Sequence, residues 1–194
     1  MYSKFLIQNK AGKFLLNDLL PGTDTTKKEE DAGSLLFDAD NDQDLDLYVV
    51  SGGNEFIKTA IEYQDRLYIN DGKGKFSLNV MALPNLLKSG SCIKAADFDK
   101  DGDLDLFIGG RLIPENYPKA TASYILRNDT KGGVVKFTDI TKAVAPELIN
   151  LGLTCDVLWT DYDNDGWLDI ALAGEWMPIT AGSRSKCPGN AFPC

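Results

Sequence analysis

Short apolar runs recur along the chain, and residues typical of turns separate them. Three of these runs, "SLLF" (34–37), "IKAA" (93–96) and "DVLW" (156–159), lead into clusters of aspartates. Runs that lead out of the clusters, such as "LFIGG" (106–110), end at glycine. Short apolar runs bounded by turn signals favour buried strands over helices. The pattern predicts an almost entirely β protein, with a helix only in minor places such as 143–148.

The aspartate cluster occurs three times and divides the chain into repeats. The copies are "DADNDQDLD" from Asp38, "DFDKDGDLD" from Asp97 and "DYDNDGWLD" from Asp161. Successive copies begin 59 and 64 residues apart. A second element, a strand ending in Asn and a Gly-containing turn before a Phe, recurs in phase at 5–14, 67–76 and 125–137. A fixed period of this kind is the signature of a repeat architecture.

Four short strands per unit, repeated in register, predict a β-propeller built of four-stranded antiparallel blades. The chain holds about three blades, fewer than the roughly 4–8 of a closed propeller. We therefore expect a partial ring or a ring that a second copy completes. A barrel or a sandwich is the alternative, although neither needs so regular a repeat. Residues 1–180 form the blades in this interpretation, and the tail at 181–194 ("AGSRSKCPGNAFPC") fits no blade.

Each aspartate cluster has the spacing of a loop that binds a cation. If the first Asp is position 1, further Asp residues stand at positions 3, 5 and 9, and position 6 is Gly in two copies. Carboxylates that alternate along a tight loop can converge on one point, and Ca²⁺ prefers several such oxygens plus a main-chain carbonyl from position 7. Mg²⁺ is less suited because it keeps several waters. The predicted ligands of up to three Ca²⁺ ions are Asp38, Asp40, Asp42, Asp44, Asp46, Asp97, Asp99, Asp101, Asp103, Asp105, Asp161, Asp163, Asp165, Asp169 and the carbonyl of Trp167.

The three loops differ from an EF-hand and from one another. An EF-hand needs a bidentate Glu at position 12, where this chain has Val49, Ile108 and Leu172. A single motif of this kind could be an exposed acidic turn without a metal, but three copies in phase argue against that interpretation. The first copy has Gln43 where the others have Gly, and a positive φ is unfavourable for Gln. We expect the first site to be the weakest.

Acidic residues outnumber basic ones and are unevenly distributed. The chain has 29 Asp and Glu against 20 Lys and Arg, a formal net charge of −9. Fourteen of the 29 acidic residues lie in the three clusters, where like charges repel unless a cation neutralises them. This balance disfavours nucleic acid as a partner, because nucleic-acid binding needs a basic face. No stretch reaches the roughly 20 apolar residues of a membrane span, and the start lacks the apolar core of a secretory signal.

The histidine and cysteine content bears on which metal sites and catalytic groups the chain can form. The chain has no His and no CxxC pattern, which disfavours the usual zinc sites and Ser-His-Asp or Cys-His catalysis. Cys92 and Cys155 lie in apolar runs and are expected to be buried thiols. Cys187 and Cys194, near the end of the tail, could pair in an oxidising compartment.

The motifs resemble a known family. The DxDxDGxxD loop, the "LFIGG" run after it and the Asn-turn-Phe hairpin are similar to FG-GAP/VCBS repeats, whose plan integrin α-subunit propellers share. Two longer stretches, 109–129 and 174–180 ("GEWMPIT"), resemble bacterial proteins of the cartilage-acidic-protein and UnbV group. The resemblance covers about residues 1–180 and implies an exported, calcium-bearing propeller whose metal ligands are the aspartates named above.

The favoured function is a non-catalytic binding, adhesion or scaffold module that recognises a protein or a glycan. Loops of this kind bind calcium at about 10⁻⁴–10⁻³ M, which favours an extracellular, periplasmic or cell-surface location. The alternatives are a calcium-dependent polysaccharide lyase, for which no acid–base pair stands out, and a half-propeller that assembles into a ring. The long connections at 52–66 and 111–124 could line a ligand surface, although most loops only connect strands. Trp159, Trp167 and Trp176 could mark an interface or a platform for a sugar, but they are expected to fill space between blades.

Overall fold

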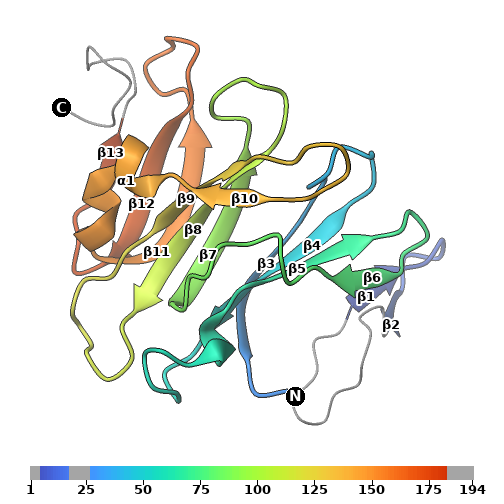
Figure 1. Cartoon of the computed structure of the whole chain (residues 1–194), viewed down its shortest axis with the longest axis horizontal. Helices are drawn as coiled ribbons and strands as arrows, with labels where there is room; N and C mark the ends of the chain where they lie inside the picture. The colour runs from blue at the N-terminus through green and yellow to red at the C-terminus, as the bar shows by residue number, and fades with distance from the viewer. Residues whose placement is uncertain (1–4, 18–26, 183–194) are drawn as a thin grey trace.

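The computed structural model describes residues 5–17 and 27–182, and these form an all-β fold, as the sequence predicts. A hairpin, two four-stranded sheets and a three-stranded sheet follow one another along the chain (Figure 1). The strands are β1 (Phe5–Gln8), β2 (Phe14–Asn17), β3 (Glu30–Phe37), β4 (Asp46–Gly52), β5 (Arg66–Asn70), β6 (Phe76–Leu78), β7 (Ser89–Ala96), β8 (Asp105–Leu112), β9 (Tyr124–Asn128), β10 (Phe137–Asp139), β11 (Leu153–Thr160), β12 (Asp169–Glu175) and β13 (Thr180–Gly182). The helical segments are η1 (Ile61–Tyr63), α1 (Thr141–Val144) and η2 (Pro146–Asn150).

Each four-stranded sheet is an antiparallel meander of consecutive strands, in the order β3-β4-β5-β6 and then β7-β8-β9-β10. The third sheet has the order β11-β12-β13, and the hairpin β1-β2 matches the last two strands of a unit. The predicted unit of four strands is therefore confirmed in two complete copies.

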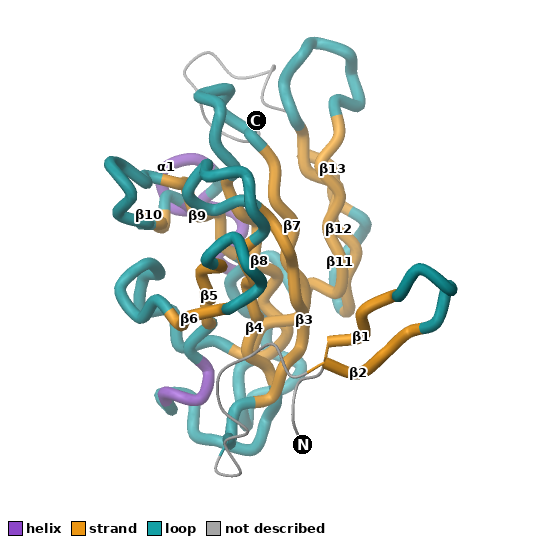
Figure 2. The backbone as a smooth tube through the Cα atoms, turned by 90° about the vertical axis from the view of Figure 1, so that its right-hand side faces the viewer, coloured by secondary structure: helices purple, strands orange, loops and turns teal. Residues whose placement is uncertain are grey.

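The sheets pack against one another through their first strands (Figure 2). The strand β7 contacts both β3 and β11. On one side the Ser91 hydroxyl donates to the Thr154 carbonyl of β11 at 2.6 Å. On the other side the backbones lie so close that a Cβ atom at Gly33 of β3 would be 2.9 Å from the Ser91 carbonyl oxygen. First strands that gather in this way are typical of propeller blades, so the fold is propeller-like.

Three apolar clusters lie between the sheets, and the smallest of them packs against Phe5 of β1. The first joins the β3–β6 sheet to the β7–β10 sheet, and the second joins the latter to β11 and β12. Both β4 and β8 are buried over most of their length, which explains their nearly continuous apolar sequences. Trp159 stacks on Phe98 with ring centroids 6.1 Å apart and meets Phe107 edge-on. Trp159 therefore fills space between blades, as expected.

Some local expectations need correction. Cys155 is exposed, and Cys92 is only partly buried. The pairing of β11 with β12 has a bulge between Thr154 and Asp156, and a bulge re-aims the extra residue, so the prediction of a buried Cys155 thiol is wrong. The helix expected near 143–148 is split into α1 and η2, with Pro146 at the junction.

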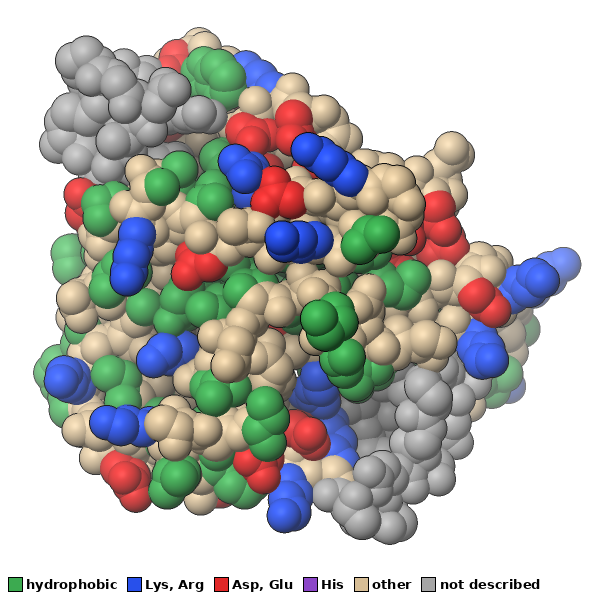
Figure 3. All heavy atoms as spheres, in the orientation of Figure 1, with side chains coloured by type: hydrophobic (Ala, Val, Ile, Leu, Met, Phe, Trp, Pro, Cys, Tyr) green, Lys and Arg blue, Asp and Glu red, His purple; other side chains and the backbone are tan. Residues whose placement is uncertain are grey.

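Other features of the described residues bear on partners. None of the helices there has the length and apolar character needed to cross a membrane. On the face drawn in Figure 3, Lys and Arg side chains are interspersed with Asp and Glu instead of gathering in one place. The strand β13 reaches Gly182, whereas Cys187, Cys194 and the rest of the predicted tail lie outside the described residues.

A partly buried carboxylate connects β4 to the segment before β5. Asp65 accepts hydrogen bonds from the Tyr48 hydroxyl at 2.9 Å and from the Ser51 backbone N–H at 2.8 Å. Burial raises the pKa of Asp65 to about 7, and the two hydrogen bonds and the charge of Arg66 only partly oppose this effect. The folded protein therefore keeps a proton on Asp65 at pH values where the unfolded chain has released it.

The substitution Asp65→Asn should make the free energy of unfolding less dependent on pH. In the wild type this carboxyl group stabilises the fold fully below about pH 4, and that contribution is lost as the pH rises through about 7. Urea unfolding of both proteins should be measured at pH values from 4 to 8. The free energy of unfolding of the variant, relative to that of the wild type, should rise by about 2–4 kcal/mol over that range. A difference that stays constant with pH would contradict the raised pKa.

Candidate metal sites

All three acidic loops lie at the same end of the molecule. Each loop is the turn between the first and second strands of its sheet, at 38–45, 97–104 and 161–168. Figure 1 shows the three turns along the upper edge of the molecule. The prediction that each acidic loop joins two neighbouring strands of one sheet is thus confirmed.

Two left-handed residues shape each loop. Position 4 has a positive φ in every copy, at Asn41, Lys100 and Asn164. Position 6 also has a positive φ in every copy, including 74° at Gln43. Asn and Gly adopt this conformation readily, whereas Gln does so at a cost. The expectation that Gln43 is held in an unfavourable conformation is confirmed.

The first aspartate of each loop holds the turn together. Asp38 accepts hydrogen bonds from the N–H groups of Asp42 at 3.2 Å and Gln43 at 2.9 Å. Asp161 accepts from the equivalent residues of the third loop at 3.0 and 2.9 Å. In the second loop Asp97 accepts from Gly102 at 3.2 Å. These bonds fix one carboxylate at the mouth of each loop.

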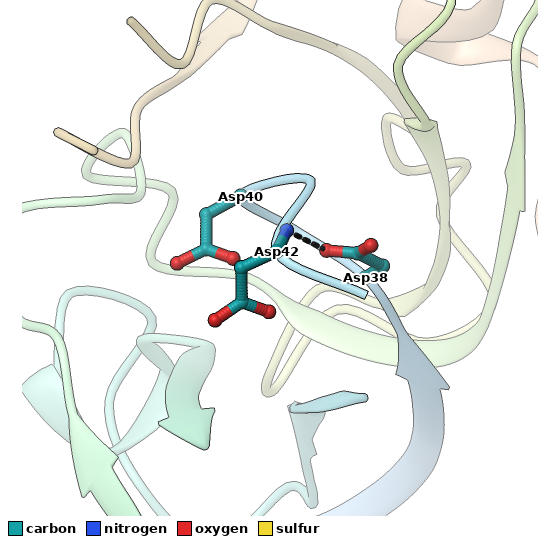
Figure 4. A group of neighbouring side chains, drawn as sticks. All are labelled: Asp38, Asp40 and Asp42. Carbon is teal, nitrogen blue, oxygen red and sulfur yellow. Dashed lines mark hydrogen bonds between the residues drawn. The ribbon is translucent and has the colours of Figure 1, made fainter. Parts of the chain in front are cut away.

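Carboxylates converge within each loop. Figure 4 shows Asp40 and Asp42 side by side, with Asp38 facing them across the turn. In each of three groups, oxygen atoms from three side chains lie within 4.8 Å of one another. The groups are Asp38, Asp40 and Asp42; Asp97, Asp99 and Asp101; and Asp161, Asp163 and Asp169. The remaining predicted ligands, Asp44, Asp46, Asp103, Asp105, Asp165 and Trp167, lie outside these groups.

Several carboxylate oxygens in the first two loops are buried and accept no hydrogen bond from the described residues. They are the Oδ1 atoms of Asp40, Asp44, Asp97, Asp99 and Asp103. A buried oxygen without a partner is unfavourable, and a bound cation would satisfy it. The donor set therefore fits a hard divalent ion, which prefers oxygen ligands.

The raised pKa values of the loop aspartates also favour a bound cation. Burial, followed by the charge of Asp42, raises the pKa of Asp40. Burial, followed by the charge of Asp101, likewise raises the pKa of Asp99. Burial, followed by the charge of Asp101, raises the pKa of Asp103 to about 6. Each shift means that the ionised carboxylate is destabilised where it lies, which a cation would reverse.

Position 7 contributes more than the sequence suggests. We expected only its main-chain carbonyl to face an ion, but the side chains of Asp44 and Asp103 each also bury one oxygen that accepts no hydrogen bond from the described residues. The third loop has Trp167 at this position, and its ring lies beneath the ammonium group of Lys100 from the second loop, 4.0 Å from the ring centroid. Adjacent loops therefore contact each other directly.

The aspartate at position 9 has a structural role, although the sequence analysis predicted it only as a metal ligand. Asp46, Asp105 and Asp169 are almost completely buried. Asp46 accepts hydrogen bonds from the N–H groups of Ala39 in its own loop at 2.9 Å and Asn70 at the end of β5 at 2.8 Å. Asp105 accepts from Asn128 at the end of β9 at 2.8 Å. This aspartate therefore ties the third strand of each complete sheet to the second.

The signal for this role was present in the sequence. Asn70 and Asn128 are the residues that recur in phase with the acidic clusters, and each now has an assigned partner. Burial raises the pKa of Asp46 to about 6 and that of Asp105 to about 7. Among the position 9 residues, only Asp169 also belongs to a group of converging oxygens.

Comparison with known proteins supports the repeat assignment. Residues 31–108 match the family described as FG-GAP-like repeat. This range covers all but the first residue of the first complete sheet, and it includes the first two acidic loops. A comparison with curated proteins found no match to the chain. This part of the chain is thus similar to an FG-GAP-like repeat, while the resemblance to VCBS repeats and to the UnbV group stays a prediction.

The substitution Gln43→Gly should stabilise the first loop even without metal. Glycine removes the penalty of about 1–2 kcal/mol that a residue with a side chain has in the left-handed conformation. Against this, glycine loses more backbone entropy on folding, which costs up to about 1 kcal/mol. We expect the free energy of unfolding in EDTA to rise by about 1 kcal/mol, and the reverse change Gly102→Gln in the second loop to lower it by a similar amount. If both changes leave the urea midpoint unaltered, the loops do not carry this conformational preference.

Replacing position 9 should damage the metal-free protein more than replacing position 5. The substitution Asp105→Ala leaves the Asn128 N–H without its acceptor in a buried place and should cost about 2–4 kcal/mol in EDTA. Asp101 is exposed, so Asp101→Ala should cost less than about 1 kcal/mol under the same conditions. Chemical denaturation of the two variants measures both values, and equal losses would argue against a structural role for Asp105.

Proposed function

We propose that the chain is a calcium-binding β-propeller repeat module. The observation that carries this proposal is the set of buried carboxylate oxygens in the first two loops that accept no hydrogen bond from the described residues, together with the convergence of three carboxylates in each loop. The third loop also brings three aspartates together, from positions 1, 3 and 9 instead of 1, 3 and 5. A chance acidic turn would instead direct its carboxylates to water, where they are well solvated.

Calcium suits these loops better than other common ions. The donors are carboxylate oxygens, several per loop, and the chain has no His. Ca²⁺ accepts six to eight oxygens in flexible geometry, whereas Mg²⁺ keeps several waters and zinc prefers Cys and His. Asp38, Asp40 and Asp42 would hold an ion in the first loop, Asp97, Asp99 and Asp101 in the second, and Asp161, Asp163 and Asp169 in the third.

The bound ions would stabilise the fold and would not take part in a reaction. Three bound Ca²⁺ ions would reduce the formal net charge from −9 to about −3 and remove the repulsion inside each loop. Since the loops form only when β3, β7 and β11 turn back into their neighbours, the ions would bind the folded chain and stabilise it.

The biological role that fits such a module is non-catalytic binding, adhesion or scaffolding outside the cytosol. Loops with affinities of about 10⁻⁴–10⁻³ M are filled where calcium is millimolar. We therefore propose an extracellular, periplasmic or cell-surface location and a protein or glycan ligand. Secretion of the full-length protein, tested by fractionating its native cells, would be absent if this location is wrong.

The open side of the third sheet suggests a further partner. Leu158 and Ile179 are 61% and 86% exposed beside a shallow hollow of about 180 Å³. Exposed apolar side chains at a sheet face favour association. Another blade, from a second copy, would cover them and extend the ring. A mass of 21.2 kDa in solution by light scattering would exclude the second copy.

Calcium should raise the melting temperature of the purified chain. At 5 mM Ca²⁺ and a dissociation constant of about 10⁻⁴ M, each filled loop adds about 2 kcal/mol of stability, or roughly 4 °C. Differential scanning calorimetry in Ca²⁺, in equimolar Mg²⁺ and in EDTA measures the effect. The variant Asp99→Asn should lose part of the calcium shift. Identical melting in all three solutions would refute the proposal.

A further inference from the structure

The end of the molecule opposite the acidic loops is built from the connections between the second and third strands of each sheet (Figure 1). These connections are 53–65, 113–123 and 176–179. The first two are joined by a hydrogen bond from the Glu115 N–H to the side-chain oxygen of Asn54 at 3.2 Å. The three sheets therefore share a surface at this end.

Four side chains from two sheets form a hydrogen-bonded chain on this surface. We call Arg111, Tyr117, Glu175 and Trp176 the aromatic cluster. The indole N–H of Trp176 donates to the Tyr117 hydroxyl oxygen at 3.1 Å, and that hydroxyl donates to Glu175 Oε2 at 3.2 Å. Glu175 Oε1 accepts from Arg111 Nη2 at 2.9 Å. Residues 58 and 59 positions apart along the chain are thus brought together.

The cluster holds two aromatic rings at the surface in fixed positions. Trp176 is 73% exposed and Tyr117 is 57% exposed, so most of each ring faces solvent while its polar atom is bonded. We expected Trp176 to fill space between blades, and its exposure shows that this expectation is wrong. The next residue, Met177, packs closely over Gly152 and Gly174, where a Cβ atom would lie 2.7 and 2.5 Å from the Met177 side chain.

The charged pair in the cluster is electrically balanced. The hydrogen bond from Arg111 lowers the pKa of Glu175, and the same bond raises the pKa of Arg111. The guanidinium group and the carboxylate therefore stay ionised and neutralise each other near neutral pH. An anionic ligand would meet no unpaired charge on Arg111 and would approach a chain with a net charge of −9.

We propose that the aromatic cluster binds a neutral oligosaccharide. A pyranose ring presents an apolar C–H face that stacks on an exposed aromatic ring, and its hydroxyl groups pair with planar polar groups beside that ring. Trp176 and Tyr117 supply the ring surfaces, and Arg111 and Glu175 supply donors and acceptors. The inference deepens the proposed role as a binding module, because it names a ligand class and a place for it.

A protein partner is less well matched to the same surface. Trp, Tyr and Arg do occur at the centres of protein interfaces, but such interfaces bury about 800 Å² on each side around an apolar core. Besides Tyr117, the exposed residues on the 113–123 connection are Glu115, Asn116, Pro118 and Lys119, three of which are polar. A short ligand that covers one or two rings is the better fit.

Fluorescence titration and calorimetry can test the proposal on the whole chain in 5 mM Ca²⁺. The probes are cellohexaose, chitohexaose and mannohexaose, with oligogalacturonate as the charged comparison. We expect at least one neutral hexasaccharide to bind and to change tryptophan fluorescence. In Trp176→Ala that binding should weaken by at least about tenfold, and in Tyr117→Phe, which keeps the ring, by less. Phe14→Ala, which removes an exposed aromatic ring on β2, should bind as the wild type does.

The outcomes separate the two proposals. Failure of all three neutral hexasaccharides to bind, binding of oligogalacturonate alone, or equal binding by the wild type and Trp176→Ala would each overturn the saccharide site. The calcium-dependent shift in melting temperature should be the same in Trp176→Ala as in the wild type, which also shows that the variant folds. If that shift is present but no sugar binds, only the saccharide site fails. If sugar binds without any calcium shift, only the calcium proposal fails.

Discussion

The crowding of carboxylates into a nine-residue bend is the constraint on which the rest of this structure depends. Each bend joins the first two strands of a sheet, and two left-handed residues fold it so that alternate aspartates face inward. Position 9 is buried and holds the third strand through its backbone. The same few residues therefore shape the turn, fix the sheet and gather negative charge, which is tolerable in a compact fold only when the charge is neutralised.

The sequence predicts the fold well because its signals are local and repeated. Short apolar runs, turn residues and the spacing of the acidic clusters suffice to give the strands, their order and the unit of four strands. The division of roles within a loop was not predictable in the same way. Asp105 and Asp101 have the same side chain, and only the three-dimensional structure shows that one is buried against Asn128 and the other is exposed.

Long-range contacts account for the remaining differences. Trp176 meets Tyr117 across two sheets, 59 residues away in sequence, and neither local pattern indicates the other. The bulge that exposes Cys155 likewise depends on how β11 pairs with β12. The two ends of the molecule consequently differ in the side chains that they expose. One end is dense in acidic side chains, and the other presents aromatic rings beside an ion pair.

Anomalous diffraction from crystals grown in millimolar calcium tests the central claim most directly. We predict a peak within each acidic loop, surrounded by carboxylate oxygens at about 2.3–2.6 Å, including those of Asp40, Asp99 and Asp163. The peak in the first loop should be the weakest, because Gln43 strains that turn. Well-ordered loops with no anomalous peak under these conditions would contradict the claim.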